Sequence, residues 1–185
     1  MLGDICFALW FFLPAALANM APIIAVKISW LVRFKAPMDG GHTFRGKRIL
    51  GDNKTWRGLI SGVVVATITL ALQQFAMANT TWFGGFTDQV DYAALPTLLL
   101  GPLFAFGALG GDAVKSFFKR QLNAKPGKPW PVADQIGEIV GAALITAPFA
   151  AFSMAQYVWV IVIWIAVDLG ISTMGYLIGW KERPV

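Results

Sequence analysis

Long apolar stretches alternate with short polar segments along this chain. Residues 59–78, for example, are twenty consecutive residues without a charge, and they follow the polar stretch ILGDNKTWRG at 49–58. A hydrocarbon core about 30 Å thick needs roughly 20 apolar residues in each spanning helix. Five stretches have that character, at about residues 5–32, 59–78, 93–111, 137–154 and 157–180. The pattern therefore predicts an all-α integral membrane protein with about five transmembrane helices in a single domain, residues 1–185.

The composition agrees with a membrane protein. Hydrophobic residues make up 57% of the chain and charged residues only 14%, whereas about 25% of the residues of a soluble domain are charged. A soluble domain with unusually buried helices is the weaker alternative, because the stretches at 59–78 and 157–180 are too long and too poor in charge. Ala16-Leu17-Ala18 resembles a signal-peptide cleavage site. The preceding residues contain Asp4 and no Lys or Arg, however, so we expect the first span to be retained.

The positive charges lie on one side of the predicted spans. Fourteen of the 15 Lys and Arg residues fall in residues 33–58, residues 112–135 and the C-terminal tail, whereas residues 79–92 hold none. Loops rich in Lys and Arg stay on the cytoplasmic side of a membrane. We therefore expect a multi-pass protein of the cell (inner) membrane, with its N-terminus outside, its C-terminus in the cytoplasm and two polar cytoplasmic loops.

The two polar loops hold more than positive charge. Attraction to anionic lipid headgroups, at about 1 kcal/mol per Lys or Arg, explains the cations but not the acids and amides between them. Asp52 and Asn53 lie in the first loop, and Asp112, Asp134 and Glu138 lie in or beside the second. Lys and Arg neutralise phosphate oxygens, and Mg²⁺ is usually held by one or two carboxylates together with substrate phosphates. The mixture favours a site that handles phosphate and a metal ion, facing the cytoplasm.

Helical spacing groups several of these side chains. If the third span continues as a helix past residue 111, then Asp112, Lys115 and Lys119 share one side of it. Asp134 and Glu138 are one turn apart near the start of the next helix, whose positive end attracts anions. Two alternatives stay open at this point, namely a capping role for Asp134 and an interfacial pairing with a cation for Glu138.

The remaining polar residues say less about which kind of site the protein has. Cys6 and His42 are the only residues of their types, so a disulfide framework and a His- or Cys-based metal site are excluded. Asn19 lies in the middle of the first span, where it is either a helix–helix hydrogen bond or part of a cavity wall. Asp168 lies in the fifth span, where we expect it to pair with Lys27 or to line a substrate cavity.

Three segments together resemble a known family. LPAALANMAP at 13–22, PMDGGHTFRGKRILGDNKTWRG at 37–58 and GDAVKSFFKRQLNAKPGKPWPVADQ at 111–135 look like the archaeal CDP-archaeol synthases and their bacterial relatives. The third segment also resembles, more distantly, the signature of the CDP-diacylglycerol synthases. The resemblance implies an integral-membrane cytidylyltransferase that joins CTP to a lipid phosphate with Mg²⁺. Its products would be pyrophosphate and a CDP-lipid of the archaeal ether type or a related phospholipid.

The resemblance implies roles for particular residues, and the polar pattern of the two loops adds Asn53 and Glu138 to them. The expected catalytic residues are Asp112, Asp134, Lys115, Lys119 and Arg120. The expected nucleotide- and phosphate-binding residues are Asp52, Asn53, Lys54, Arg57 and Lys128. The expected metal ligands are Asp112, Asp134 and Glu138. Asn19 and Pro22 match the family pattern in the first helix. The expected partners are CTP, a membrane lipid phosphate and the bilayer, without nucleic acid, and the oligomeric state stays open.

One position departs from the family pattern. The third segment of that pattern ends in Asp-Gln-Leu-Asp, whereas this chain reads Asp134-Gln135-Ile136-Gly137 and then Glu138. Gly137 and Gly141 also form a small-xxx-small pair that lets helices approach closely. The substitution leaves two expectations open, a working enzyme in which Glu138 compensates, or a membrane scaffold with weakened or lost activity. A small transporter is the third alternative, although no internal symmetry supports it.

Overall fold

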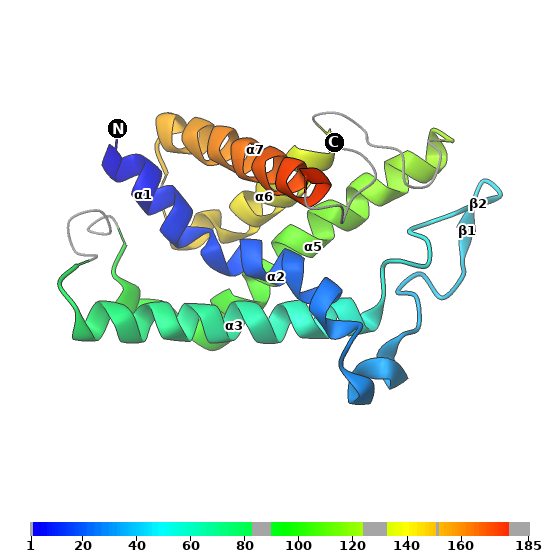
Figure 1. Cartoon of the computed structure of the whole chain (residues 1–185), viewed down its shortest axis with the longest axis horizontal. Helices are drawn as coiled ribbons and strands as arrows, with labels where there is room; N and C mark the ends of the chain where they lie inside the picture. The colour runs from blue at the N-terminus through cyan, green and yellow to red at the C-terminus, as the bar shows by residue number, and fades with distance from the viewer. Residues whose placement is uncertain (1, 83–89, 124–132, 151, 178–185) are drawn as a thin grey trace.

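The computed structural model of the chain describes residues 2–82, 90–123, 133–150 and 152–177. Its elements follow one another in a mainly helical arrangement (Figure 1). The α-helices are α1 (Leu2–Phe11), α2 (Leu13–Ala25), α3 (Trp56–Asn79), α5 (Thr97–Gln121), α6 (Ala133–Thr146) and α7 (Met154–Leu177). The 3₁₀ helices are η1 (Ser29–Phe34), η2 (Tyr92–Ala94) and η3 (Ala147–Phe149). Strands β1 (Thr43–Phe44) and β2 (Lys47–Arg48) form one small antiparallel hairpin.

The predicted apolar stretches coincide with helices, but the first, third and fourth differ from them in shape or extent. The first stretch is not one helix, since α1 and α2 meet at a bend of 43°. Pro14 occupies the first turn of α2, where its missing N–H costs no hydrogen bond. The third stretch starts later and continues as α5 through Gln121. The fourth ends at Thr146, because Pro148 follows and a proline cannot continue an α-helix without loss of a hydrogen bond.

Among the described residues, α3 and α5 are long and apolar enough to span a membrane by length and composition, and the bent pair α1–α2 is a third candidate if it counts as one span. The apolar parts of α6 and α7 are shorter, at Ile136–Phe149 and Met154–Val167. The five-span count and the orientation of the termini therefore stay predictions.

Helix α5 occupies the middle of the packing. It contacts α2 and α3 on one side and α6 on another, while α7 packs against α1 and α6 (Figure 1). Aromatic rings fill the core where α1, α2 and α5 meet the segment before α7. The rings in mutual contact are Phe7, Phe11, Phe12, Phe104 and Phe152.

Glycines bring α5 and α6 into backbone contact. A Cβ atom placed on Gly111 would overlap the carbonyl oxygen of Gly137, and one placed on Gly141 would overlap that of Gly107. The pair Gly107 and Gly111 of α5 therefore packs into the pair Gly137 and Gly141 of α6. Such a close approach is what the small-xxx-small spacing predicts. This contact fixes the relative positions of the residues that follow Gly111 and Gly137 in the chain.

We expect Gly111→Leu to separate α5 from α6 and to lower the stability of the protein by at least about 1–3 kcal/mol, the usual cost of overpacking. Thermal unfolding of the purified protein in detergent measures this effect. Gly170→Leu in α7 is the matched control, because nothing described lies within 4 Å of a Cβ atom at that position. Equal melting temperatures for Gly111→Leu and Gly170→Leu would contradict a close α5–α6 contact.

Candidate functional site

The first polar loop folds around the carboxylate of Asp39, whose side chain is only 1% exposed. One carboxylate oxygen of Asp39 accepts hydrogen bonds from the backbone N–H groups of Leu50 at 2.9 Å and Gly51 at 3.0 Å. The other accepts from the N–H of Gly41 at 3.1 Å and from Nη2 of Arg48 at 2.8 Å. Gly51 has a φ of +92°, a conformation that side chains other than glycine rarely adopt. Asp39 thus joins both ends of the loop.

The charge on Asp39 is stabilised by these donors. The Arg48 guanidinium lowers the pKa of the Asp39 carboxyl well below its usual range, with help from the N–H groups of Gly51, Leu50 and Gly41. A carboxyl whose pKa is lowered by folding stabilises the folded state above its unfolded pKa. That contribution is complete above the ordinary pKa of 3.8 and is lost as the pH falls through the lowered value. The loop is therefore expected to keep its shape throughout the physiological pH range.

The loop docks on the end of α5. Lys47 Nζ donates a 2.6 Å hydrogen bond to the carbonyl oxygen of Gln121, and the ring of Phe44 lies 5.9 Å from that of Phe117. The Arg120 guanidinium lies against Gly51, since its Nη2 atom is 3.1 Å from where a Cβ atom of that glycine would be. These contacts hold the loop over the C-terminal turns of α5.

The loop then returns beside its own start and leads directly into α3. The N–H of Met38 donates a 2.7 Å hydrogen bond to the carbonyl oxygen of Lys54, and Pro37 and Thr55 form an isolated bridge. Thr55 caps α3, because its hydroxyl accepts from the N–H of Gly58 at 3.2 Å. This arrangement holds Lys54 at the start of α3, with its side chain turned toward α5.

Two carboxylates from different helices share one lysine at this point. Lys115 Nζ lies 3.0 Å from Oδ1 of Asp112 and 3.2 Å from Oε1 of Glu138. The second oxygen of Asp112 pairs with Lys54, and the second oxygen of Glu138 accepts a hydrogen bond from the Asn19 side chain. The cluster therefore joins α2, the first loop, α5 and α6.

The side chains of the cluster are mostly withdrawn from solvent. Exposed fractions are 15% for Asp112, 11% for Lys115, 13% for Glu138 and 23% for Lys54. Charges at such depth are costly unless they are paired and hydrogen-bonded. Each carboxylate here has two partners, so two negative and two positive side chains balance one another. A phosphate group that reaches the cluster can take over the lysines as its own partners.

A cavity of about 280 Å³ opens beside the cluster. Its polar wall consists of Asn19, Asn53, Lys54, Asp112 and Glu138. The rest of the wall is mainly apolar and comes from Pro22, Ile23, Met38, Thr55, Gly58, Leu59, Leu109 and Ala113. Both interpretations of Asn19 therefore hold, since it forms a helix–helix hydrogen bond and also lines the cavity.

The structure brings together five of the residues expected from the sequence, namely Asn53, Lys54, Asp112, Lys115 and Glu138.

Other expected residues lie elsewhere. The Asp52 side chain is 79% exposed and pairs with Arg48 at 2.8 Å, away from the cavity wall. Arg57 and Lys119 are also not among the residues that line the described cavity, and Arg120 packs against the first loop. The nucleotide-side roles of Asp52 and Arg57 and the phosphate roles of Lys119 and Arg120 stay predictions.

For three of the expected residues, either the whole residue or its side chain lies outside the part of the chain that the structure describes. Lys128 lies outside the described residues. The backbone of Asp134 belongs to the first turn of α6, but its side chain is outside the description, as is that of Asp168. The convergence of Asp134 with Asp112, the capping role of Asp134 and the pairing of Asp168 with Lys27 therefore stay predictions.

Sequence reasoning missed Asp39. The residue lies inside a segment that carries the family resemblance, but its role depends on Arg48 and Gly51, which are 9 and 12 positions further along the chain. A local signal did exist, because an Asp before two glycines often hydrogen-bonds a backbone N–H two residues on. The Asp39–Gly41 bond has that form.

The cluster offers part of a site for a divalent cation. Within the described ranges no group of three or more His, Cys, Asp or Glu side chains could hold a metal ion. Oδ1 of Asp112 and Oε1 of Glu138 lie 3.0 Å and 3.2 Å from the same atom, Nζ of Lys115. The two carboxylates are therefore close neighbours. Mg²⁺ commonly uses one or two carboxylates and completes its shell with phosphates and water. The donor set therefore fits Mg²⁺ bound together with a phosphorylated substrate.

Comparisons with known proteins agree along the whole chain. A family model described as CarS-like, CDP-archaeol synthase, matches residues 1–185. The CDP-archaeol synthase of Thermococcus onnurineus is 37% identical over 184 residues, which cover 99% of this chain and 98% of the relative. That of Halobacterium salinarum is 32% identical over 191 residues, covering 100% and 98%.

A solved structure is also similar. It is that of an intramembrane enzyme for archaeal membrane lipid biosynthesis, and it matches with a TM-score of 0.70 and 28% identity. The match covers 89% of this chain and 91% of that one.

We expect Asp39→Asn to loosen the first loop, because the variant removes the charge that Arg48 contacts and leaves an amide among N–H donors. Loss of a buried hydrogen-bonded partner costs about 1–3 kcal/mol, which corresponds to a roughly 5- to 150-fold increase in loop opening. Limited trypsin digestion at neutral pH, read by the cleavage rate after Lys47, Arg48 and Lys54, measures this opening. Asp52→Asn is the matched control, since that carboxylate contacts the same Arg48 from an exposed position. Equal cleavage rates in the two variants would show that Asp39 does not organise the loop.

Proposed function

This chain belongs to the CDP-archaeol synthase family, and on that premise we propose how its site performs the transfer of CMP from CTP to a lipid phosphate. The protein is a membrane cytidylyltransferase that forms a CDP-lipid and releases pyrophosphate. The observation that carries the assignment of the site is the paired cluster of Lys54, Asp112, Lys115 and Glu138 beside the C-terminal half of α5.

The reaction needs positioning more than proton transfer. A phosphate monoester has its second pKa near 6, so the lipid phosphate is mostly a dianion at neutral pH. One of its oxygens attacks the α-phosphorus of CTP, the bond from that phosphorus to the bridging oxygen breaks, and pyrophosphate leaves with the bond electrons. No general base is required for this step. The difficulty is that both reactants are highly anionic, and catalysis comes from holding them together against their repulsion.

The lysines of the cluster supply that attraction. In the structure Lys54 and Lys115 are neutralised by Asp112 and Glu138. We assign Lys54 to the nucleotide side, because it lies with Asn53 on the cavity wall. We assign Lys115 to the lipid phosphate or the leaving pyrophosphate. Lys115 contacts one oxygen of Asp112, and Lys54 contacts the other. Lys119, Arg120 and Lys128 remain candidate phosphate contacts from the resemblance.

Asp112 and Glu138 would hold Mg²⁺, with Asp134 as the third expected ligand. When bound, Mg²⁺ would neutralise and orient the phosphate oxygens of both reactants. Glu138 would then replace the acid that the family pattern has at position 137. It lies one position further along the chain, and its side chain contacts Lys115 and Asn19. These contacts support the proposal that Glu138 takes the place of the acid missing at position 137.

The surroundings of the cluster suit a site at the cytoplasmic membrane surface. The cluster lies where the apolar part of α5 gives way to a turn that contains Lys119 and Arg120. The loop beside it carries four of the positive charges expected on the cytoplasmic side, namely Arg45, Lys47, Arg48 and Lys54, and Arg57 follows in the first turn of α3. We therefore propose that the site lies on the cytoplasmic side of the cell membrane. CTP would reach it from the water and the lipid phosphate from the bilayer.

We expect the purified protein, supplied with labelled CTP, Mg²⁺ and a panel of ether and ester lipid phosphates, to form CDP-lipid and pyrophosphate. Asp112→Asn is expected to lower kcat by at least about 10²-fold, since a preorganised electrostatic contact of this kind is worth that much. Asp91→Asn, which lies at the start of η2, is the control for a neutralised acid outside the cluster. A wild-type rate for Asp112→Asn would refute its role.

Glu138→Gln tests whether this acid replaces the one missing at position 137. The amide keeps the size and the hydrogen bond to Asn19 but removes the negative charge. We expect kcat/KM to fall at least about tenfold and the Mg²⁺ concentration for half-maximal rate to rise, as for loss of one charged ligand. An unchanged Mg²⁺ dependence would exclude Glu138 as a ligand.

A further inference from the structure

The chain between α2 and the first polar loop forms a surface that the reaction does not use. Residues 26–36, which we call the η1 segment, project from the fold beside the start of α3, on the side away from α7 (Figure 1). Leu31 is buried, with 3% of its surface exposed, and η1 contacts α3. Most other residues of the segment are exposed. The segment is therefore fixed to the fold on one side and open on the other.

The η1 segment stays close to the ends of the two helices that it joins. Before it, Pro22 of α2 lies beside Gly58 of α3, since a Cβ atom on that glycine would be 3.3 Å from the proline ring. At its end, the carbonyl oxygen of Ala36 accepts a 3.1 Å hydrogen bond from the N–H of Trp56, the first residue of α3. The chain thus leaves the helix pair and returns to it within one turn of α3. Because α3 is long and apolar enough to span a membrane, the segment lies at the level where that span begins.

Exposed apolar side chains continue from α2 into the η1 segment. Ile23 and Ile24 are exposed in the last turn of α2, and Val26, Trp30 and Val32 follow them, with Trp30 59% exposed. Tryptophan is enriched where the hydrocarbon core of a membrane meets the headgroups. The exposed apolar surface of the segment is therefore continuous with that of α2 and ends at an interfacial residue type.

The positive charges of the η1 segment have no acid among them. Lys27, Arg33 and Lys35 are exposed, and residues 5–38 contain no Asp or Glu. The ion pairs between described side chains involve other residues. Since Lys27 is the expected partner of Asp168, Arg33 and Lys35 are the two charges left for a ligand from outside the chain.

Two aromatic rings hold the Arg33 guanidinium beside Trp30. Its central carbon lies 5.5 Å from the centroid of the Trp30 ring and 5.0 Å from that of Phe34. The face of an aromatic ring attracts a cation without accepting its N–H groups in ordinary hydrogen bonds. A guanidinium can then bind a phosphate through two of those donors. Arg33 is thus a phosphate-binding group placed next to an interfacial tryptophan.

We propose that the η1 segment binds the headgroup of an anionic membrane lipid other than the substrate. The phosphate of this lipid contacts Arg33 and Lys35, and Trp30 lies against the upper part of its chains. Charge complementarity carries the proposal, together with the continuity of the exposed apolar surface with that of α2. A lipid fits because cations and apolar side chains alternate here, and a water-soluble polyanion would leave the apolar ones in water. The proposal does not depend on the proposed reaction.

The test measures binding of an anionic phosphodiester lipid with brominated chains to the purified protein in a neutral detergent at low ionic strength, read by quenching of tryptophan fluorescence. Arg33→Gln is expected to weaken binding about fivefold, the effect of one cation near an anionic lipid surface, and Arg33→Gln with Lys35→Gln about 25-fold. Arg33→Lys should keep most of the affinity. Arg45→Gln is the matched control and should bind as wild type does. Arg45 also lies over an aromatic ring, 5.3 Å from that of Phe44, but on the β1–β2 hairpin, apart from the η1 segment (Figure 1).

A second pair of variants locates the bound lipid. Trp30→Phe is expected to remove more of the quenching at saturating lipid than Trp82→Phe does. Trp82 is also exposed, but it follows the opposite end of α3. Equal changes in these two variants would contradict a lipid held at the η1 segment.

Several results would overturn the proposal. Equal losses in Arg33→Gln and Arg45→Gln would show a general attraction of basic loops to anionic lipid. Equal binding of a brominated lipid without charge would remove the role of the cations. Competition by the water-soluble headgroup alone, at the same concentrations as the lipid, would indicate a phosphate site or a site for a soluble polyanion.

The probe also separates this site from the cluster. A phosphodiester has no phosphate monoester to react with CTP, so Asp112→Asn should bind it as wild type does. Loss of binding in Asp112→Asn would assign the lipid to the cluster and overturn the proposal. Binding at the η1 segment without any CDP-lipid formation by wild-type protein would support the proposal and refute the proposed function instead.

Discussion

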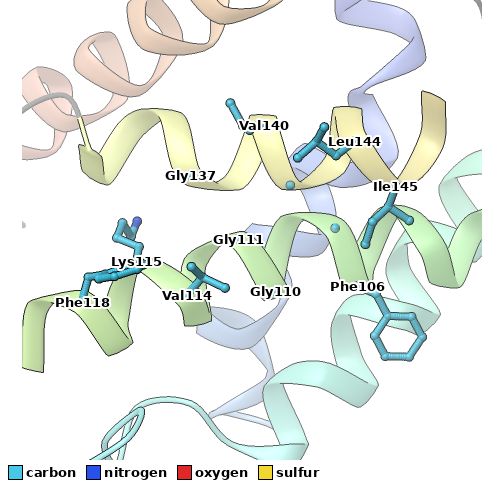
Figure 2. A pocket seen from close by; sticks show the side chains of 12 residues that line it. Phe106, Gly110, Gly111, Val114, Lys115, Phe118, Gly137, Val140, Leu144 and Ile145 are labelled. Carbon is cyan, nitrogen blue, oxygen red and sulfur yellow. The ribbon is translucent and has the colours of Figure 1, made fainter. Parts of the chain in front are cut away.

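The backbone contact between Gly111 and Gly137 determines where the charged cluster of this protein lies. Each glycine is followed directly by an acid of the cluster, Asp112 on α5 and Glu138 on α6. Because the two backbones touch, the two carboxylates emerge beside each other, and Lys115, one turn along α5, reaches both. The same contact leaves an apolar groove of about 610 Å³ along the helix pair, lined by residues of both helices (Figure 2).

The rest of the fold serves this contact. The aromatic core between α1, α2 and α5 holds α2 where Asn19 can reach Glu138. The first loop, closed by Asp39, rests on the end of α5 and places Lys54 opposite Asp112. The charges of the cluster cancel in pairs before any substrate arrives, which makes partly buried acids tolerable. In the mechanism we propose, the lysines of these pairs bind phosphate and the carboxylates bind the cation.

Sequence patterns could predict the helices and half of the site because both depend on local spacing. The continuation of α5 past Gly111 places Asp112 and Lys115 on one side, as the i and i+3 spacing requires. The interpretation of Glu138 as a carboxylate paired with a cation is confirmed by its contact with Lys115. The bend near Phe12 and the early end of α6 were not predicted, since hydropathy does not register a change of helix direction. Asp39 and the pairing of Lys54 with Asp112 join positions that no periodic pattern connects, the latter 58 residues apart.

The proposed mechanism requires Asp112 and Glu138 to act as one unit around a shared partner. A double-mutant cycle of Asp112→Asn and Glu138→Gln, measured as kcat/KM for CDP-lipid formation, tests this most directly. Groups in one network show coupling of about 0.5–3 kcal/mol, so we predict that the double variant loses little more than the worse single variant. Losses that multiply, with each residue contributing independently of the other, would contradict a shared site.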